Sequence, residues 1–191
     1  HFPEERWPDL LRGLTSAGEE LGFEPLGASD RWLAARELTS RQIETLASHL
    51  TVGETYFLRE PGSFEVLAQE ILPPLVARRA TASRTLRLWS AGCCTGEEAY
   101  SLAITCARVV PDLRAWNVSI LATDINLKFL TKAEVGVYTP WSFRGAPDWL
   151  RDQFFSGASD KRLAISPAVK KLVHFAYLNL AEDAYPSLHN H

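Results

Sequence analysis

A strand, a glycine loop and a helix follow one another between Leu86 and Val110. Residues 86–89, Leu-Arg-Leu-Trp, alternate as a short strand does, and Gly92 and Gly96 then enclose a loop. Residues 97–110 have the spacing of a helix, whose apolar face would carry Ala99, Leu102, Ala103, Cys106 and Val110. This order constrains the fold strongly, because it is the first half of a parallel α/β unit.

A second strand and helix repeat the pattern. Residues 118–122 are apolar and are closed by Thr123-Asp124, and residues 126–135 predict a helix that stops at Gly136. Strand, helix, strand, helix is typical of a doubly wound sheet. We therefore expect a Rossmann-like α/β domain over residues 61–191.

A different pattern is expected over about residues 150–178. Residues 162–165 and 172–178 predict two strands, separated by Ser166-Pro167 and too close together for a parallel crossover. This predicts a small antiparallel β insert. In the alternative, residues 172–180 run on into the main sheet.

Residues 1–60 predict a small all-α domain. Leucines such as Leu33 recur at three- and four-residue offsets, with breaks at Gly22, Pro25 and Gly27. The motif Thr39-Ser40-Arg41-Gln42 predicts a capping box at the start of the last helix. This segment holds 6 Lys/Arg and 11 Asp/Glu, against 14 and 12 in residues 61–191, so the acidic charge lies at the front.

One further helix is expected in the connection to the α/β domain. It covers residues 62–79 and has Phe64, Leu67 and Val76 on its apolar side. Pro73-Pro74 must kink or restart this helix, because proline has no backbone N–H.

Composition and charge exclude several classes of function. Neither half is strongly basic, which argues against nucleic acid. No apolar run approaches the roughly 20 residues of a membrane span, so we expect a cytoplasmic protein without membrane insertion. Three cysteines and scattered histidines, including His1, His189 and His191, show no metal-ligand spacing, and no metal is expected. Because the chain has no methionine, we expect it to be a segment of a longer protein.

The loop from Gly92 to Gly96 is the first candidate site, because its backbone N–H groups could surround a ligand. Glu97 and Glu98 would repel a phosphate, and the phosphate-binding glycine spacings are absent. S-adenosylmethionine is cationic and has no phosphate, so nearby acids would attract it. The alternative is a tight turn that needs glycine for conformation only.

Two acids have competing interpretations. Glu98 either contacts the ligand or forms a capping box with Thr95, and Glu97 is expected to be a solvated acid of the first helical turn. Asp124 ends the second strand, where an acid could accept bonds from both ribose hydroxyls. In the alternative, Asp124 caps the helix that follows.

Four blocks of the sequence resemble the CheR-type chemoreceptor methyltransferases in order and spacing. They are Thr-Val-Gly-Glu-Thr-Tyr-Phe-Leu-Arg-Glu at 51–60, Trp-Ser-Ala-Gly-Cys-Cys-Thr-Gly-Glu-Glu at 89–98, Ala-Thr-Asp-Ile-Asn at 122–126, and Asn179-Leu180. The resemblance covers about residues 51–186. It implies a helical domain, an S-adenosylmethionine-binding α/β domain with an antiparallel insert, and methylation of glutamate side chains on chemoreceptors, which leaves S-adenosylhomocysteine.

The resemblance also implies roles for individual residues. By position, those around the cofactor are Thr55, Arg59, Glu98, Asp124, Asn179 and Leu180, in addition to Gly92 of the loop. Arg59 is the residue assigned to the reaction, where it would position cofactor and substrate carboxylate. On sequence alone, Arg59 could instead form a surface ion pair with Glu54 or Glu60.

Two departures from the family pattern leave alternatives open. Gly53 stands where the family often has asparagine, and the chain ends eleven positions after Leu180, before the family's Cys-Arg-Asn strand. Part of the site is therefore expected to be absent. One alternative is a catalytically incomplete module that binds S-adenosylmethionine or a receptor. Another is self-association through the incomplete sheet edge.

Overall fold

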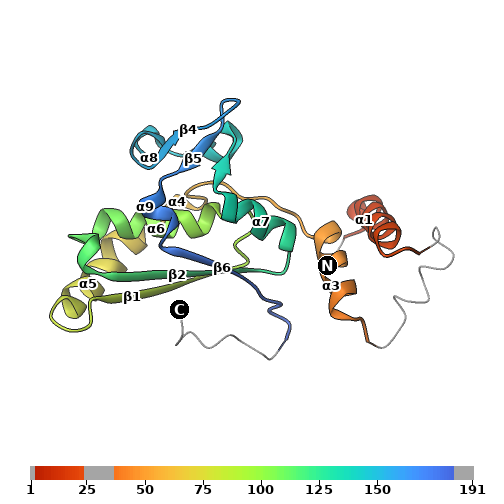
Figure 1. Cartoon of the computed structure of the whole chain (residues 1–191), viewed down its shortest axis with the longest axis horizontal. Coiled ribbons are helices and arrows are strands. Elements are labelled where there is room, and N and C mark those ends of the chain that lie inside the picture. The colour runs from red at the N-terminus through yellow and green to blue at the C-terminus, as the bar shows by residue number, and fades with distance from the viewer. Residues whose placement is uncertain (1–2, 24–36, 183–191) are drawn as a thin grey trace. The chain divides into compact units, whose positions relative to one another are not determined.

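The computed structural model describes residues 3–23 and 37–182, which form two compact units (Figure 1). The first unit comprises the described residues up to Val52 together with Ile125–Lys128. The second comprises Gly53–Asp124 and the described residues from Phe129 onward. Residues 53–60, which the sequence placed at the end of the helical domain, lie in the second unit. The helix breaks predicted at Pro25 and Gly27, the apolar position Leu33 and the terminal histidines lie outside the described residues.

The described part of the first unit is built from short helical elements. These are η1 (Glu4–Arg6), α1 (Trp7–Glu20) and α3 (Ser40–Leu50). Ala17 and Ala47 are buried within the unit. The predicted capping box is confirmed: Thr39 Oγ1 accepts the Gln42 N–H at 3.3 Å, and Gln42 Oε1 accepts the Thr39 N–H at 2.9 Å.

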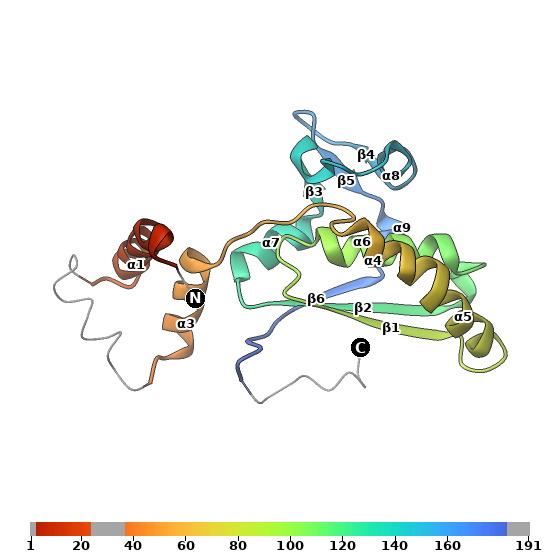
Figure 2. The ribbon, with the colours of Figure 1, turned by 180° about the vertical axis from the view of Figure 1, so that it is seen from behind.

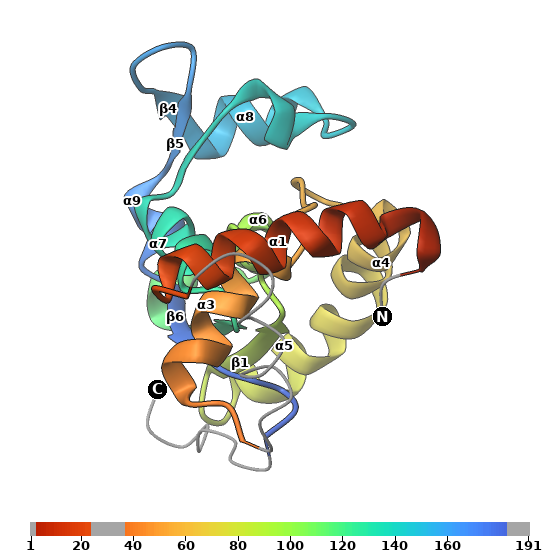
Figure 3. The ribbon, with the colours of Figure 1, turned by 90° about the vertical axis from the view of Figure 1, so that its right-hand side faces the viewer.

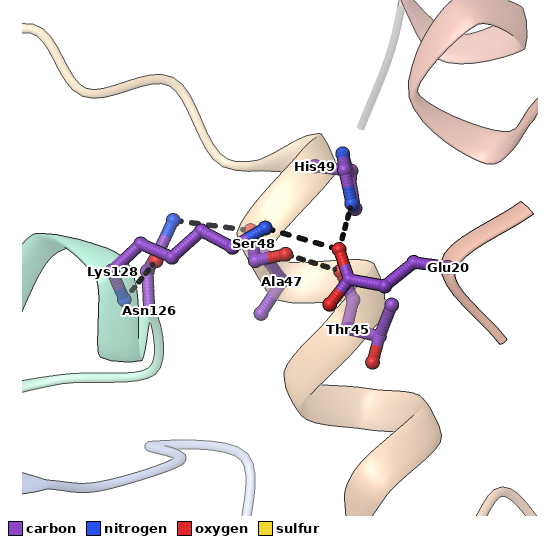
Figure 4. A network of polar contacts seen from close by, with 7 residues as sticks. All are labelled: Glu20, Thr45, Ala47, Ser48, His49, Asn126 and Lys128. Atoms are coloured by element: carbon purple, nitrogen blue, oxygen red, sulfur yellow. Dashed lines mark hydrogen bonds and ion pairs between the residues drawn. The ribbon is translucent and has the colours of Figure 1, made fainter. Parts of the chain in front are cut away.

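A polar network joins α3 to Ile125–Lys128 within the first unit (Figure 4). Asn126 is fully buried, and its Nδ2 donates to Thr51 Oγ1 at 2.8 Å, while its Oδ1 accepts the Lys128 N–H at 2.9 Å. Glu20 Oε2 lies 2.8 Å from His49 Nε2 and 3.1 Å from Lys128 Nζ. Asn126 therefore satisfies backbone and hydroxyl groups at two helix ends.

This network makes the stability of the unit depend on pH. The hydrogen bond from His49, followed by that from Lys128, lowers the pKa of Glu20 below its ordinary value of 4.5. A lowered folded-state pKa gives stability that is present above the unfolded pKa and is lost as the pH falls through the folded value. Urea titrations of the wild type and Glu20→Gln should therefore differ at about pH 6, and the difference should shrink as the pH falls below 4.5. A difference that persists unchanged in acid would contradict this assignment.

The second unit is built on a parallel three-stranded sheet in the order β1-β2-β6. Ala91 pairs with Thr123, and Asp124 with Tyr177, so all three strands end at the same edge. In Figures 1 and 2, α6, α7 and α9 lie on one side of this sheet. The strands are β1 (Thr85–Ala91), β2 (Asn117–Asp124) and β6 (Val173–Tyr177), and the helices are α6 (Glu97–Val109), η3 (Leu113–Ala115), α7 (Leu127–Val135) and α9 (Pro167–Lys170).

A small antiparallel sheet in the order β3-β5-β4 forms the predicted insert. Figure 3 shows it beyond the helical layer, on the side away from the sheet. The predicted range of about 150–178 was wrong at both ends. At its start, the strand β3 that pairs with β5 lies at Val137–Tyr138. At its end, β6 joins β2 in parallel, as the alternative had allowed. The insert elements are β3 (Val137–Tyr138), η4 (Pro140–Phe143), α8 (Asp148–Phe154), β4 (Phe155–Gly157) and β5 (Leu163–Ile165).

The helix expected at residues 62–79 continues through its prolines, because it changes from α-helical to π-helical hydrogen bonding before them. It runs as α4 (Pro61–Val66), a π-helical segment η2 (Leu67–Ile71) and α5 (Leu72–Ala80). The Leu72 N–H donates to the Leu67 carbonyl, five residues back. Pro73 and Pro74 lack the N–H groups of an α-helical continuation, and the π turn accommodates that loss.

An aromatic cluster joins the insert to residues 53–60. The Phe57 ring is fully buried and lies 4.9 Å from Tyr138, 5.0 Å from Phe143 and 5.0 Å from Phe155, measured between ring centroids. Burying a side chain of this size stabilises a fold by about 1.5–3 kcal/mol. Phe57 therefore anchors residues 53–60 to the core of the α/β unit.

Within the described ranges, every helix is too short or too polar to traverse a lipid bilayer.

Candidate cofactor site

The loop that follows β1 uses its backbone amides internally. The N–H groups of Gly92 and Cys93 both donate to the Thr123 carbonyl, at 2.8 and 2.9 Å, and the Cys94 N–H donates to Asp124 Oδ2 at 2.8 Å. The expectation that these amides surround a ligand is therefore wrong for these three groups. A loop whose donors are already engaged is poorly suited to a phosphate.

Asp124 lies at the end of β2 and is 9% exposed. Its carboxylate holds the glycine loop through Cys94, while Asn126 accepts the Lys128 N–H at the start of α7. Asn126 therefore caps the start of α7. Asp124 remains next to the loop, at the sheet edge where nucleoside ligands bind in such folds.

In the first turn of α6, neither the capping box considered for Glu98 nor the solvent exposure expected for Glu97 is found. The N-cap is Gly96, at φ 94°, and no side chain caps the helix, so the Thr95–Glu98 capping box was wrong. Glu98 Oε1 instead accepts the Ser90 hydroxyl at 2.6 Å. Glu97 was expected in solvent but is only 3% exposed, because Ser142 and Thr95 donate to its two carboxylate oxygens.

A cavity of about 80 Å³ opens beside this loop. It brings together four of the predicted residues, Thr55, Arg59, Gly92 and Glu98. Its volume is below the roughly 300–1,000 Å³ of typical ligand pockets. The cavity is therefore large enough to hold only one end of a cofactor. The remaining lining residues, which the sequence analysis had not assigned, are Glu54, Tyr56, Phe64, Cys93 and Cys94.

Arg59 lies at this cavity rather than in a surface ion pair with Glu60. Its Nη1 donates to the backbone carbonyl of Glu54 at 2.8 Å. The carboxylate of Glu54 lies 3.6 Å from Arg144, whose guanidinium is 4.2 Å from the Tyr56 ring centroid and 4.5 Å from that of Trp141. The segment that carries Thr55 and Arg59 is therefore held by η4 and the residue that follows it.

Asn179 and Leu180 follow β6 at the same sheet edge but do not line the cavity. The Leu178 N–H donates to the Asp124 carbonyl at 3.1 Å, which places this turn beside β2. Asn179 bonds locally, to Glu182 and to the Ala181 N–H, and Leu180 is half exposed. Their contact with a cofactor stays a prediction.

Gly53, the departure from the family pattern, has a local explanation. A Cβ atom at this position would lie 2.6 Å from Cζ of Phe129. An asparagine therefore requires the Phe129 ring to move. The hydrogen bond that asparagine would make is replaced here by close contact with an aromatic ring.

Three non-glycine residues beside the cavity adopt left-handed backbone conformations. They are Leu58 at φ 54°, Glu60 at φ 61° and Cys94 at φ 50°. Such conformations cost about 1–3 kcal/mol each and persist where the surrounding structure holds them, often at functional sites.

Cys93, Cys94 and Cys106 are free thiols. Burial raises the pKa of Cys106 to about 12, and it raises the pKa of Cys93 and Cys94 as well. Among the residues that the structure describes, His, Cys, Asp and Glu do not gather in a group that could hold a metal ion.

The residues at the cavity fit a cationic cofactor. Two acids, Glu54 and Glu98, line it together with Arg59, and a third acid, Asp124, holds the adjoining loop. Tyr56, Ser142 and Arg144 were not predicted from the sequence, although Tyr56 lies inside the block at residues 51–60. Ser142 and Arg144 carry no local signal, because they reach the site from the insert.

The fold and the site define the class of the protein: an α/β domain with the parallel sheet typical of S-adenosylmethionine-dependent methyltransferases. A family model described as "CheR methyltransferase, SAM binding domain" matches residues 53–190. The chain therefore belongs to the CheR methyltransferase family.

Curated relatives agree with this membership. The "Chemotaxis protein methyltransferase" of Borreliella burgdorferi is 32% identical over 147 residues, covering 76% of this chain and 52% of the relative. "Chemotaxis protein methyltransferase 1" of Pseudomonas aeruginosa is 35% identical over 182 residues, covering 92% of this chain and 64% of the relative. The chain thus spans between half and two thirds of the length of these relatives.

Proposed function

We propose that this chain binds S-adenosylmethionine and takes part in transferring its methyl group to glutamate side chains of methyl-accepting chemoreceptors. S-adenosylhomocysteine is the other product. The observation that carries the proposal is the acid-lined cavity at the carboxyl end of β1, beside a loop whose amides are engaged internally. The names of the two relatives reported above, both chemotaxis protein methyltransferases, support the choice of substrate.

The residues assigned to the cofactor are Thr55, Arg59, Gly92, Glu98, Asp124, Asn179 and Leu180. Glu98 attracts the cationic end, and Asp124 accepts hydrogen bonds from the ribose hydroxyls. When bound, S-adenosylmethionine supplies a methyl group on a sulfonium, which a carboxylate can attack without prior activation.

The chain's own residues then have a positioning task. A glutamate side chain has a pKa of about 4.3 and is ionised at neutral pH, so no general base is required. Arg59 orients the incoming carboxylate by charge-assisted hydrogen bonds. Tyr56 and Phe64, which line the cavity, exclude water from the reacting groups.

The direct test uses methyl-labelled S-adenosylmethionine and the signalling fragment of a chemoreceptor. Label should appear on receptor glutamates as a base-labile ester, and a receptor with glutamine at the methylation sites should stay unlabelled. Label that resists base would reject the glutamate ester.

A second function is favoured by the length comparison: a module that binds S-adenosylmethionine or a receptor without catalysis. Calorimetry distinguishes the two, because cofactor heat without label transfer indicates binding only. The absence of heat with both cofactor and receptor would reject both functions.

Cys94 offers a footprint of the bound cofactor. It lines the cavity and is partly exposed, whereas Cys93 and Cys106 are buried. We expect iodoacetamide to modify Cys94 first, slowly because its pKa is raised, and S-adenosylhomocysteine to slow this modification further. Mass spectrometry of the Cys94 peptide measures both rates, and equal rates with and without ligand would place the cofactor elsewhere.

Two further proposals concern the whole protein. Its proposed location is the cytoplasm, where the signalling parts of chemoreceptors are methylated, and cell fractionation checks this. Self-association through an edge strand of the β1-β2-β6 sheet predicts a sedimentation coefficient that rises with concentration.

A further inference from the structure

Glu97 is a buried acid that the proposed reaction does not use. Its side chain belongs to the first turn of α6, yet the residue is only 3% exposed. Ser142 Oγ donates to Oε1 at 2.9 Å, and Thr95 Oγ1 donates to Oε2 at 2.6 Å. An acid buried at this depth costs free energy unless it is hydrogen-bonded, and both of its oxygens are.

The two hydroxyl donors come from different parts of the unit. Thr95 belongs to the glycine loop, whereas Ser142 lies in η4 of the insert. The loop has a second tie to the insert, because Tyr138 Oη donates to the Thr95 carbonyl at 2.9 Å. Glu97 therefore sits where the loop meets the insert.

The same contacts extend to the segment that carries Thr55 and Arg59. The Phe57 N–H donates to the Ser142 carbonyl at 2.9 Å, and the Leu58 N–H donates to Ser101 Oγ at 3.0 Å. Ser142 thus bonds to Glu97 through its side chain and to this segment through its backbone. Both sides of the cavity are connected through one serine.

We infer that Glu97 is a positioning residue that fixes the glycine loop and residues 54–59 in the arrangement that binds the cofactor. The inference rests on the proposed function and deepens it, because it assigns the insert a task inside the cofactor site. Glu97 acts through Thr95 and Ser142 and does not itself line the cavity beside Glu98.

The test compares Glu97→Ala and Glu97→Gln with Ser142→Ala, which deletes a single hydroxyl. Ser156→Ala, an exposed serine in β4 of the same insert, is the matched control. Calorimetry with S-adenosylhomocysteine gives the Kd, and amide hydrogen exchange gives the protection of residues 54–59 and 92–98. Urea unfolding reports any global loss of stability.

We expect Glu97→Ala to raise the Kd about tenfold, corresponding to about 1.4 kcal/mol, and Ser142→Ala about threefold. Glu97→Gln should recover much of the affinity, because hydroxyls can donate to its oxygen and accept from its NH₂ group. Exchange should rise in residues 54–59 and 92–98 while β2 keeps its protection. Ser156→Ala should match the wild type.

Unchanged exchange in both segments, or an equal rise throughout the unit, would overturn the inference. An unchanged Kd in Ser142→Ala and Glu97→Ala would do the same. If Glu97→Ala does not fold, Ser142→Ala and Tyr138→Phe decide the question. A wild type that binds no cofactor defeats the proposed function instead, and the exchange measurements still decide the role of Glu97.

Discussion

Gly96→Ala is expected to destabilise the α/β unit by about 2–5 kcal/mol, far more than the same change at Gly92. Both glycines have positive φ, 94° and 81°, and a left-handed alanine costs about 1–2 kcal/mol at either position. Only at Gly96 would the new Cβ meet neighbours, 2.9 Å from Ala133 Cβ and 3.0 Å from Tyr138 Oη. Overpacking adds about 1–3 kcal/mol there.

Urea titration followed by near-ultraviolet circular dichroism measures this difference. Gly92→Ala is the matched control, since a Cβ there meets no atom within 4 Å. Equal destabilisation by the two substitutions would show that α7 shifts to accommodate the methyl group. Because Gly96 is the N-cap of α6, its effect should also appear in the affinity for S-adenosylmethionine.

Asp124→Ala is expected to weaken S-adenosylmethionine binding about a hundredfold. Hydrogen bonds to charged groups contribute about 1.5–3 kcal/mol each, and the proposed ribose contacts would be lost together. The substitution also leaves the Cys94 N–H without its carboxylate acceptor, which loosens the loop. Asp124→Asn keeps an oxygen for Cys94 but loses the charge, so a loss of about tenfold is expected.

Calorimetry with S-adenosylmethionine measures both losses, and Asp152→Asn, an exposed acid in α8, is the control. The comparison separates two contributions of Asp124. If Asn and Ala weaken binding equally, the charge matters and the bond to Cys94 does not. Wild-type affinity in Asp124→Ala would remove this residue from the cofactor site.

Features that depend on a few neighbouring residues could be predicted from the sequence. The strand, glycine loop and helix around Gly92 were confirmed, as were the capping box at Thr39 and the end of α7 at Gly136. Hydrophobic period and local capping chemistry are expressed within one or two turns of chain. At Pro73 the sequence predicted a kink or a restart, whereas the helix continues through a π-helical segment at Leu67–Ile71.

The predictions that were wrong concern features that depend on contact with a segment distant in the sequence. The capping box considered for Thr95 and Glu98 does not form, because Glu98 accepts a hydrogen bond from Ser90 instead. Strand β6 pairs with β2 and not with the insert. Strand pairing and side-chain burial depend on which distant segments of the chain come into contact, and a local sequence pattern does not predict those contacts.

The loop around Glu98 shows most clearly which features the sequence determines and which depend on the tertiary structure. The sequence by itself determined the strand, loop and helix that carry Glu98, and its acids indicated a cationic ligand. Only the tertiary structure decided that Glu97 is buried, because its partner Ser142 is 45 positions away in the insert. It also decided that the loop amides bond to β2, since parallel pairing brings Thr123 and Asp124 beside the end of β1.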